Sequence, residues 1–219
     1  MPRSIAPSAV VERIWSLYLS EAGVLLPVAA VLFAIQLAIA LLLPIGLALV
    51  LSLLFLVLSL LYQGFVVELV SQARAGVRVA SPGDLLRAVT PLLGPLLAIT
   101  ILFAVGVIVG FVLIIVPGLV LLTFWSVVVP VEVIEQRGVI GSFTRSRELV
   151  RGNGWNVFGV IVIVYVAVLA VSLLAGIVSA PLGHVGRDIV QWAVNVAITP
   201  VVALSASVLY FELIDAGAG

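Results

Sequence analysis

Long apolar runs that contain almost no charged residue dominate the chain. Six can be delimited, at residues 24–43, 46–67, 95–116, 118–134, 157–179 and 188–211. A helix needs roughly 20 apolar residues to cross the hydrocarbon core of a bilayer. Because lipid offers the backbone no hydrogen-bond partners, a spanning segment must be helical or part of a closed barrel. The runs lack the alternation of barrel strands. The sequence therefore predicts an all-α membrane protein with about six transmembrane helices.

The overall composition agrees with a lipid environment. Of the 219 residues, 64% are hydrophobic and 9% are charged, whereas soluble domains average about 45–50% and about 25%. So few polar side chains could not cover the surface of a soluble fold, and we expect one membrane domain over residues 1–219. The first apolar run follows Glu12, Arg13 and Glu21. In a signal peptide a short apolar core directly follows a basic start, and acidic residues do not precede it as they do here. We therefore expect this run to be retained as the first span.

The arginines predict the orientation of the chain. All ten basic residues are arginine and the net charge is zero, which gives no general attraction to nucleic acid. Six spans would place both termini and the loops 68–94 and 135–156 on one side of the membrane. Arginines accumulate on the cytoplasmic side of membrane proteins, so both termini are expected to be cytoplasmic. Arg187 alone falls on the other side, and the remaining nine are Arg3, Arg13, Arg74, Arg78, Arg87, Arg137, Arg145, Arg147 and Arg151.

A threefold repeat is visible in the residues between the apolar runs. A serine, which is a favoured helix N-cap, opens each of three short amphipathic stretches, and a proline–glycine turn joins each following pair of runs. The serines are Ser8, Ser81 and Ser142, and the turns are at 44–46, 117–118 and 181–183. The predicted unit is an interfacial helix followed by a transmembrane hairpin, with pseudo-repeats at approximately 8–70, 81–136 and 142–214.

The third amphipathic stretch carries the first candidate site. On a helical wheel its arginines lie apart from an apolar side formed by Val139, Ile140, Phe143, Ser146 and Val150. Such a helix is expected to lie flat in the membrane interface with its apolar side down. Its basic side chains would then meet anionic lipid head groups. The candidate head-group contacts are Arg145, Arg147 and Arg151.

The segment 117–161 resembles the membrane domain found attached to some bacterial and archaeal glycerophosphoryl diester phosphodiesterases, which also occurs alone. In that family a span opening with Pro-Gly leads through a proline to a glutamate and then to an amphipathic helix. The matching residues are Pro117, Gly118, Pro130, Glu135, Ser146, Leu149 and Arg151. The resemblance implies a helical membrane domain in a prokaryotic plasma membrane. It implies no phosphodiesterase activity, because the family's catalytic barrel is a separate domain that this chain lacks.

A second candidate site lies on the sixth run. Gln191, Asn195 and Thr199 recur every four residues and share one helix face. They are interpreted either as a polar path or binding face inside a helix bundle, or as interhelical hydrogen-bonding groups, with Gln36 as a possible partner. Gly106 and Gly110 form a GxxxG pattern that fits an internal helix contact or a homo-oligomer interface equally well.

Motifs for catalysis are missing from the sequence. There is no cysteine, the one histidine is His184 in a predicted turn, and no HExxH, GxSxG, P-loop or Rossmann pattern occurs. We therefore expect no catalytic residues, metal site or cofactor, with a membrane-embedded hydrolase as a minor alternative.

The two candidate sites predict two different functions for the protein. The first is lipid binding or membrane organisation through the interfacial helices, with membrane lipids as partners. The second is a small transporter or channel with a polar path along the sixth helix.

Overall fold

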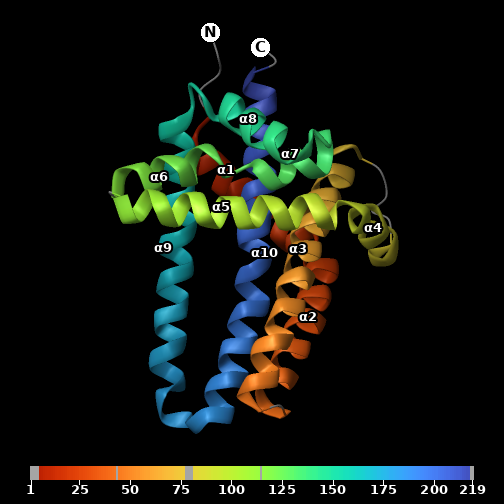
Figure 1. Cartoon of the computed structure of the whole chain (residues 1–219), viewed down its shortest axis with the longest axis vertical. Helices are drawn as coiled ribbons and strands as arrows, with labels where there is room; N and C mark the ends of the chain where they lie inside the picture. The colour runs from red at the N-terminus through yellow and green to blue at the C-terminus, as the bar shows by residue number, and fades with distance from the viewer. Residues whose placement is uncertain (1–4, 43, 77–80, 114, 218–219) are drawn as a thin grey trace.

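Figure 1 shows the computed structural model, which describes residues 5–42, 44–76, 81–113 and 115–217 and contains only helices and turns in these ranges. Arg3 and Arg78, two of the arginines used for the orientation, lie outside them. The helices are α1 Pro7–Ser20, α2 Ala22–Leu42, α3 Ile45–Arg74, α4 Pro82–Val89, α5 Leu93–Leu113, α6 Ile115–Phe124, α7 Val128–Glu135, α8 Gly138–Val150, α9 Gly154–Ser179 and α10 Gly183–Gly217, with short 3₁₀ turns η1 Thr90–Leu92 and η2 Ala180–Leu182.

Four long helices, α2, α3, α9 and α10, run along the longest axis of the molecule (Figure 1). The end of α2, the start of α3 and the α9–α10 connection lie at one end of this axis, and both termini lie at the other. Five stretches of the described residues are long and apolar enough to cross a membrane: Ala22–Ile39, Phe55–Arg74, Pro82–Leu113, Ile115–Glu135 and Gly154–Gly217. The last stretch contains both α9 and α10. The predicted helical class is thus confirmed, and these stretches have the length and apolarity that membrane-spanning helices need, while the count of six spans stays a prediction.

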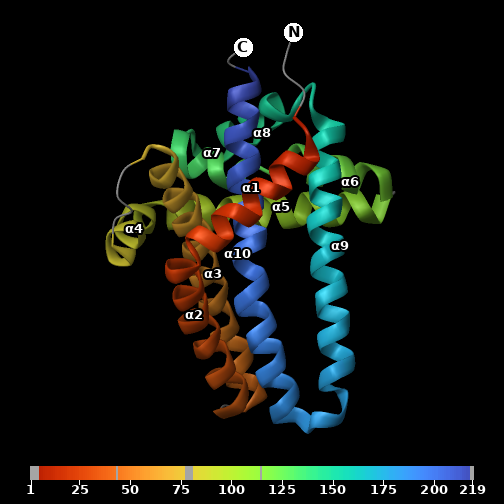
Figure 2. The same cartoon turned by 180° about the vertical axis from the view of Figure 1, so that it is seen from behind.

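The central pair of predicted spans is arranged differently from the other four. Helix α5 runs across the long axis on one side of the bundle, and α6 turns back along it, while α1 crosses the opposite side (Figures 1 and 2). The predicted fourth span is also interrupted, because α6 ends at Phe124 and α7 begins at Val128. Pro117 and Gly118 were expected in the turn but lie inside α6. The α5–α6 hairpin therefore does not stand beside the long helices.

Glycines allow α5 and α6 to approach each other closely. A Cβ atom added at Gly110 of α5 would lie 2.9 Å from Cα of Gly118 in α6. A Cβ added at Gly106 would lie 2.4 Å from the ring of Trp125, which follows α6. Such distances are shorter than van der Waals contact, so only glycine fits without displacement. The GxxxG pattern is thus occupied by contacts within the chain.

The predicted N-caps are correct for one short helix and wrong for two. The Ser81 hydroxyl accepts a hydrogen bond from the Asp84 amide at 3.3 Å and caps α4. Ser8 instead lies inside α1, because the helix starts with Pro7, whose fixed φ suits a first helical position. Ser142 lies inside α8, which already begins at Gly138 after the left-handed residue Gln136.

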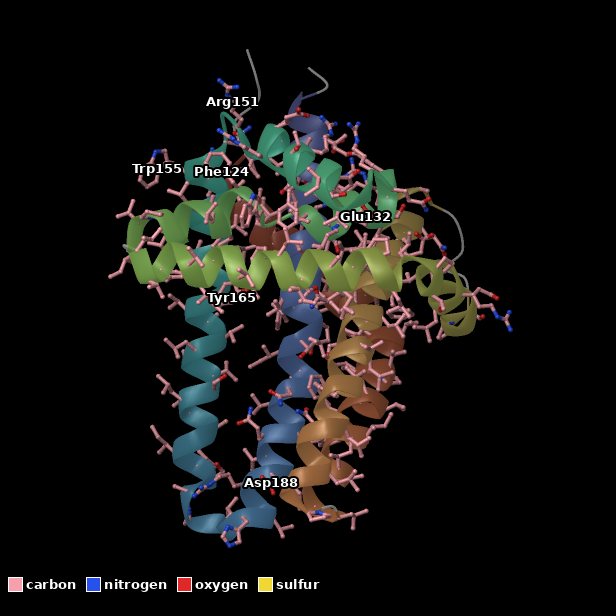
Figure 3. The ribbon with its side chains drawn as sticks, in the orientation of Figure 1. Phe124, Glu132, Arg151, Trp155, Tyr165 and Asp188 are labelled. Carbon is pink, nitrogen blue, oxygen red and sulfur yellow. The ribbon has the colours of Figure 1, made fainter. Side chains whose placement is uncertain are left out.

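The main core lies at the end of the bundle that carries the termini. Helices α1, α2, α3, α9 and α10 meet there, together with the start of α7. The largest fully buried side chains of this core include Leu25, Tyr62, Phe65, Leu69, Leu204 and Tyr210. Helices α5 and α9 instead expose many large apolar side chains (Figure 3). In a membrane protein such surfaces contact lipid tails.

Candidate functional site

Two buried serines hold α8 against the protein. The Ser142 hydroxyl donates to the Glu132 carboxylate of α7 at 2.6 Å, and the Ser146 hydroxyl donates to the Phe124 carbonyl at 2.8 Å. Both serines are fully buried, and Glu132 is 2% exposed. Ser146 and Val150, which were expected on the membrane-facing side, are fully buried, whereas Ile140 of the same side is 68% exposed. Part of the side expected to face the membrane is therefore packed against protein, since the Ser146 hydroxyl has an internal acceptor in the Phe124 carbonyl.

The carboxylate of Glu135 joins three helices. Both its oxygens lie 3.2 Å from Nε of Arg145 in α8, and one accepts a hydrogen bond from the Tyr210 hydroxyl of α10 at 3.1 Å. Nε of Arg137 donates to it at 2.5 Å. Arg145 also lies 3.6 Å from the carboxylate of Glu148. Arg145, one of the three predicted head-group contacts, therefore belongs to an internal ion-pair cluster.

Arg147 and Arg151 are in a different situation. Both are exposed, and neither forms an ion pair with any described residue. The other described arginines on the predicted cytoplasmic side all pair with a carboxylate: Arg13 with Glu212, Arg74 with Asp215, Arg87 with Asp84, and Arg137 and Arg145 with Glu135. Among the described residues, unpaired basic charge at this end is thus concentrated at the end of α8.

An exposed tryptophan lies near Arg151, whose backbone amide donates to the Arg147 carbonyl at 3.0 Å. Trp155, in the first turn of α9, is 87% exposed, and Figure 3 shows it and Arg151 at the same outer corner of the molecule. Tryptophan is enriched where membrane and water meet, since its ring is amphipathic. The corner formed by Arg147, Arg151 and Trp155 therefore combines two free guanidinium groups with an interfacial side chain, and it is called the α8 corner below.

Two residues of the predicted polar face of α10 bind each other. The side-chain amide of Gln191 donates to Asn195 at 3.0 Å along the helix. Thr199, one turn further, lines a cavity shared with α3, α5 and α9. In the described part of the chain no hydrogen bond links Gln36 to this face. The structure thus shows pairing within one helix rather than between helices.

Sequence reasoning missed the roles of the two glutamates of α7. Glu132 and Glu135 both bind side chains of α8, and no sequence motif assigned them this role. Each partner, Ser142 or Arg145, lies ten positions later, and the intervening turn brings them together. No local spacing rule signals such a contact. Among the described residues no group of three or more His, Cys, Asp or Glu side chains could hold a metal ion.

Comparison with known proteins adds no assignment to this geometry. No family model, curated protein or solved structure matches the chain. The function is therefore inferred from the arrangement of the residues themselves.

Proposed function

We propose that this protein is a non-catalytic integral membrane protein that binds anionic lipid head groups at the α8 corner. The supporting observation is that Arg147 and Arg151 lack a carboxylate partner, while the other described arginines of that end have one. A planar guanidinium group can donate two parallel hydrogen bonds to a phosphate. Two such groups one helical turn apart offer a phospholipid a bidentate contact at each.

This proposal refines the head-group site expected from sequence. Arg145 contributes little to lipid binding, since Glu135 and Glu148 already compensate its charge. Trp155 fixes the depth of the corner at the membrane interface. We place this end on the cytoplasmic side of a prokaryotic plasma membrane, where the leaflet is anionic and attracts juxtamembrane basic residues. The family resemblance of residues 117–161 agrees with such a location and stays a prediction.

Arg147→Gln/Arg151→Gln is expected to weaken the binding of phosphatidylglycerol by roughly 30-fold. The estimate follows from about 1 kcal/mol for each basic residue near an anionic surface. Binding can be measured by native mass spectrometry of protein titrated with the lipid in a neutral detergent. Arg187→Gln is the matched control, because Arg187 is exposed at the other end and has no ion pair in the described part of the chain.

The same lipid titration distinguishes binding at the α8 corner from a general electrostatic attraction between the anionic lipid and any basic residue. Arg145→Gln should change the affinity much less than the double substitution, since that guanidinium is already paired. Retention of phosphatidylglycerol by the double variant at the wild-type level would reject the α8 corner as the head-group site. An equal loss in Arg187→Gln would show that any removed positive charge has the same effect.

A second candidate function is transport along α10. The observation in its favour is the interrupted helix at the cavity, since Trp125 and Ser126 between α6 and α7 line the same cavity as Thr199. Transporters often place interrupted helices at such sites. Flux of small neutral solutes into proteoliposomes, abolished by Asn195→Leu, would favour transport over simple lipid binding.

A further inference from the structure

A cavity of about 440 Å³ lies between α3, α5, α7, α9 and α10. Its volume is within the range of about 300–1,000 Å³ that is typical of small-molecule sites. None of the residues that line it is charged, and most are apolar. Tyr165, one of its lining residues, lies on α9 just beyond the level at which α5 crosses (Figure 3). The lining of this cavity suits an uncharged, largely apolar molecule.

Three helices each contribute a polar side chain to the cavity that has no hydrogen-bond partner among the described residues. These are Gln63 from α3, Tyr165 from α9 and Thr199 from α10. The other hydroxyl groups of serine and threonine in the lining are already satisfied, because they donate to carbonyls of their own chain segments at 2.7–2.9 Å: Thr100, Ser126 and Ser205. An unpaired polar group is unfavourable in hydrocarbon. All three free groups can donate a hydrogen bond, so they match a molecule that carries acceptor oxygens.

The depth of the cavity excludes a charged head group. Tyr165 follows Trp155 by ten residues on α9, which is about 15 Å along a helix that rises 1.5 Å per residue. With Trp155 at the interface, this places the cavity near the middle of a hydrocarbon core about 30 Å thick. A phosphate would be costly there. Tyr165 is 53% exposed, so the cavity is accessible from the surface of α9 that faces the hydrocarbon.

We infer that this cavity binds an uncharged lipid through its carbonyl oxygens, with Gln63, Tyr165 and Thr199 as the hydrogen-bond donors. The site is separate from the α8 corner, and the inference does not depend on head-group binding there. Two kinds of lipid supply this chemistry, an acylglycerol with ester carbonyls and a long-chain quinone with ring carbonyls. A phospholipid does not fit, because its ester carbonyls are tied to a head group at the interface.

Trp125 provides a direct readout of occupancy. It lines the cavity, and its ring packs against Gly106 and Phe143. Brominated diacylglycerol, or a long-chain quinone, is titrated at low mole fraction into protein in nanodiscs of zwitterionic phospholipid. Both probes quench tryptophan fluorescence on contact. We expect saturable quenching that is lost in Trp125→Phe, whereas quenching of the other tryptophans should rise linearly with probe.

Removal of the three donors should weaken binding strongly. For Gln63→Leu/Tyr165→Phe/Thr199→Val we expect about 20-fold weaker binding of the carbonyl probe, at about threefold per hydrogen bond within a membrane. Tyr165→Phe alone, which keeps the ring and removes the hydroxyl, should weaken binding of the carbonyl probe about threefold. Gln36→Leu is the matched control, since Gln36 is an exposed amide on α2 that does not line the cavity. Size-exclusion chromatography and circular dichroism report whether each variant is folded.

The outcomes distinguish an acylglycerol from a quinone as the ligand, and both from binding that does not use the three hydrogen-bond donors. Saturable binding of only the acylglycerol or only the quinone assigns the source within the proposed class. The inference is overturned if a brominated alkane of equal length binds as tightly as the carbonyl probes. It is also overturned if the triple variant, or Tyr165→Phe where the triple variant does not fold, keeps wild-type affinity. Because Arg147 and Arg151 are unchanged in these proteins, failure here leaves head-group binding at the α8 corner untouched.

Discussion

Replacement of Glu135 by leucine is expected to lower the free energy of unfolding by about 2–3 kcal/mol. Loss of this carboxylate from a partly buried, charge-assisted cluster leaves Arg137 and Tyr210 without their acceptor and Arg145 with only Glu148 at 3.6 Å, and this costs more than the pair itself contributes. Glu135 is the only described carboxylate that contacts α8 and α10 together, through Arg145 and Tyr210. Its side chain is 16% exposed, so water can compensate only part of the loss.

Denaturant unfolding in detergent micelles, followed by circular dichroism, measures this effect. Glu148→Leu is the control, because Glu148 also faces Arg145 but is 59% exposed, and surface pairs contribute only about 0–1 kcal/mol. If Glu135→Leu and Glu148→Leu lower the free energy of unfolding equally, the Glu135 cluster does not hold the helices together. A double-mutant cycle with Tyr210→Phe isolates the link between α7 and α10.

The Glu135 cluster also connects stability to the proposed head-group site. It binds Arg145, and the buried serines hold the neighbouring side of the same helix. Arg147 lies on the side of α8 away from these serines, because successive residues of a helix are 100° apart, and both Arg147 and Arg151 are exposed. A helical wheel of residues 139–151 shows polarity alone, and it cannot show that Ser142 and Ser146 have internal acceptors.

The four long helices could be predicted from sequence because each apolar run ends at proline, glycine or charged residues. Thus α2, α3, α9 and α10 occupy 22–42, 45–74, 154–179 and 183–217, close to the expected ranges and extended mainly at their charged ends. Such runs need only length and apolarity to be recognised, and both are properties of the local sequence.

The direction of the α5–α6 hairpin could not be predicted in the same way. Helix α5 is apolar on every side, so its sequence does not indicate which face should meet protein. A helix of this kind has the same hydropathy whether it lies across the bundle or along it. Its direction depends on contacts distant in sequence, including the ring of Trp125 over Gly106 and the packing of Leu96 with Val67 and Val133.

Gly110→Ala is therefore expected to destabilise the hairpin, with a cost of about 1–3 kcal/mol for overpacking a close contact. The added Cβ would lie 2.9 Å from Cα and 3.0 Å from the amide nitrogen of Gly118. These are backbone atoms, so no side-chain rotation can relieve the contact, and α5 and α6 must separate. At Gly106 the obstacle is the ring of Trp125, which is able to tilt, so Gly106→Ala should cost less.

Gly176→Ala is the matched control within a long helix. A Cβ at Gly176 would meet no atom within 4 Å, so only the higher helix propensity of alanine acts, and stability should stay equal or rise by up to about 1 kcal/mol. The two variants carry the same chemical change, and opposite signs in denaturant unfolding would assign the difference to the α5–α6 contact. Equal effects would mean that the close approach at Gly110 is not required. The hairpin would then be held across the bundle by its other contacts, among which Leu96 is fully buried against α3 and α7.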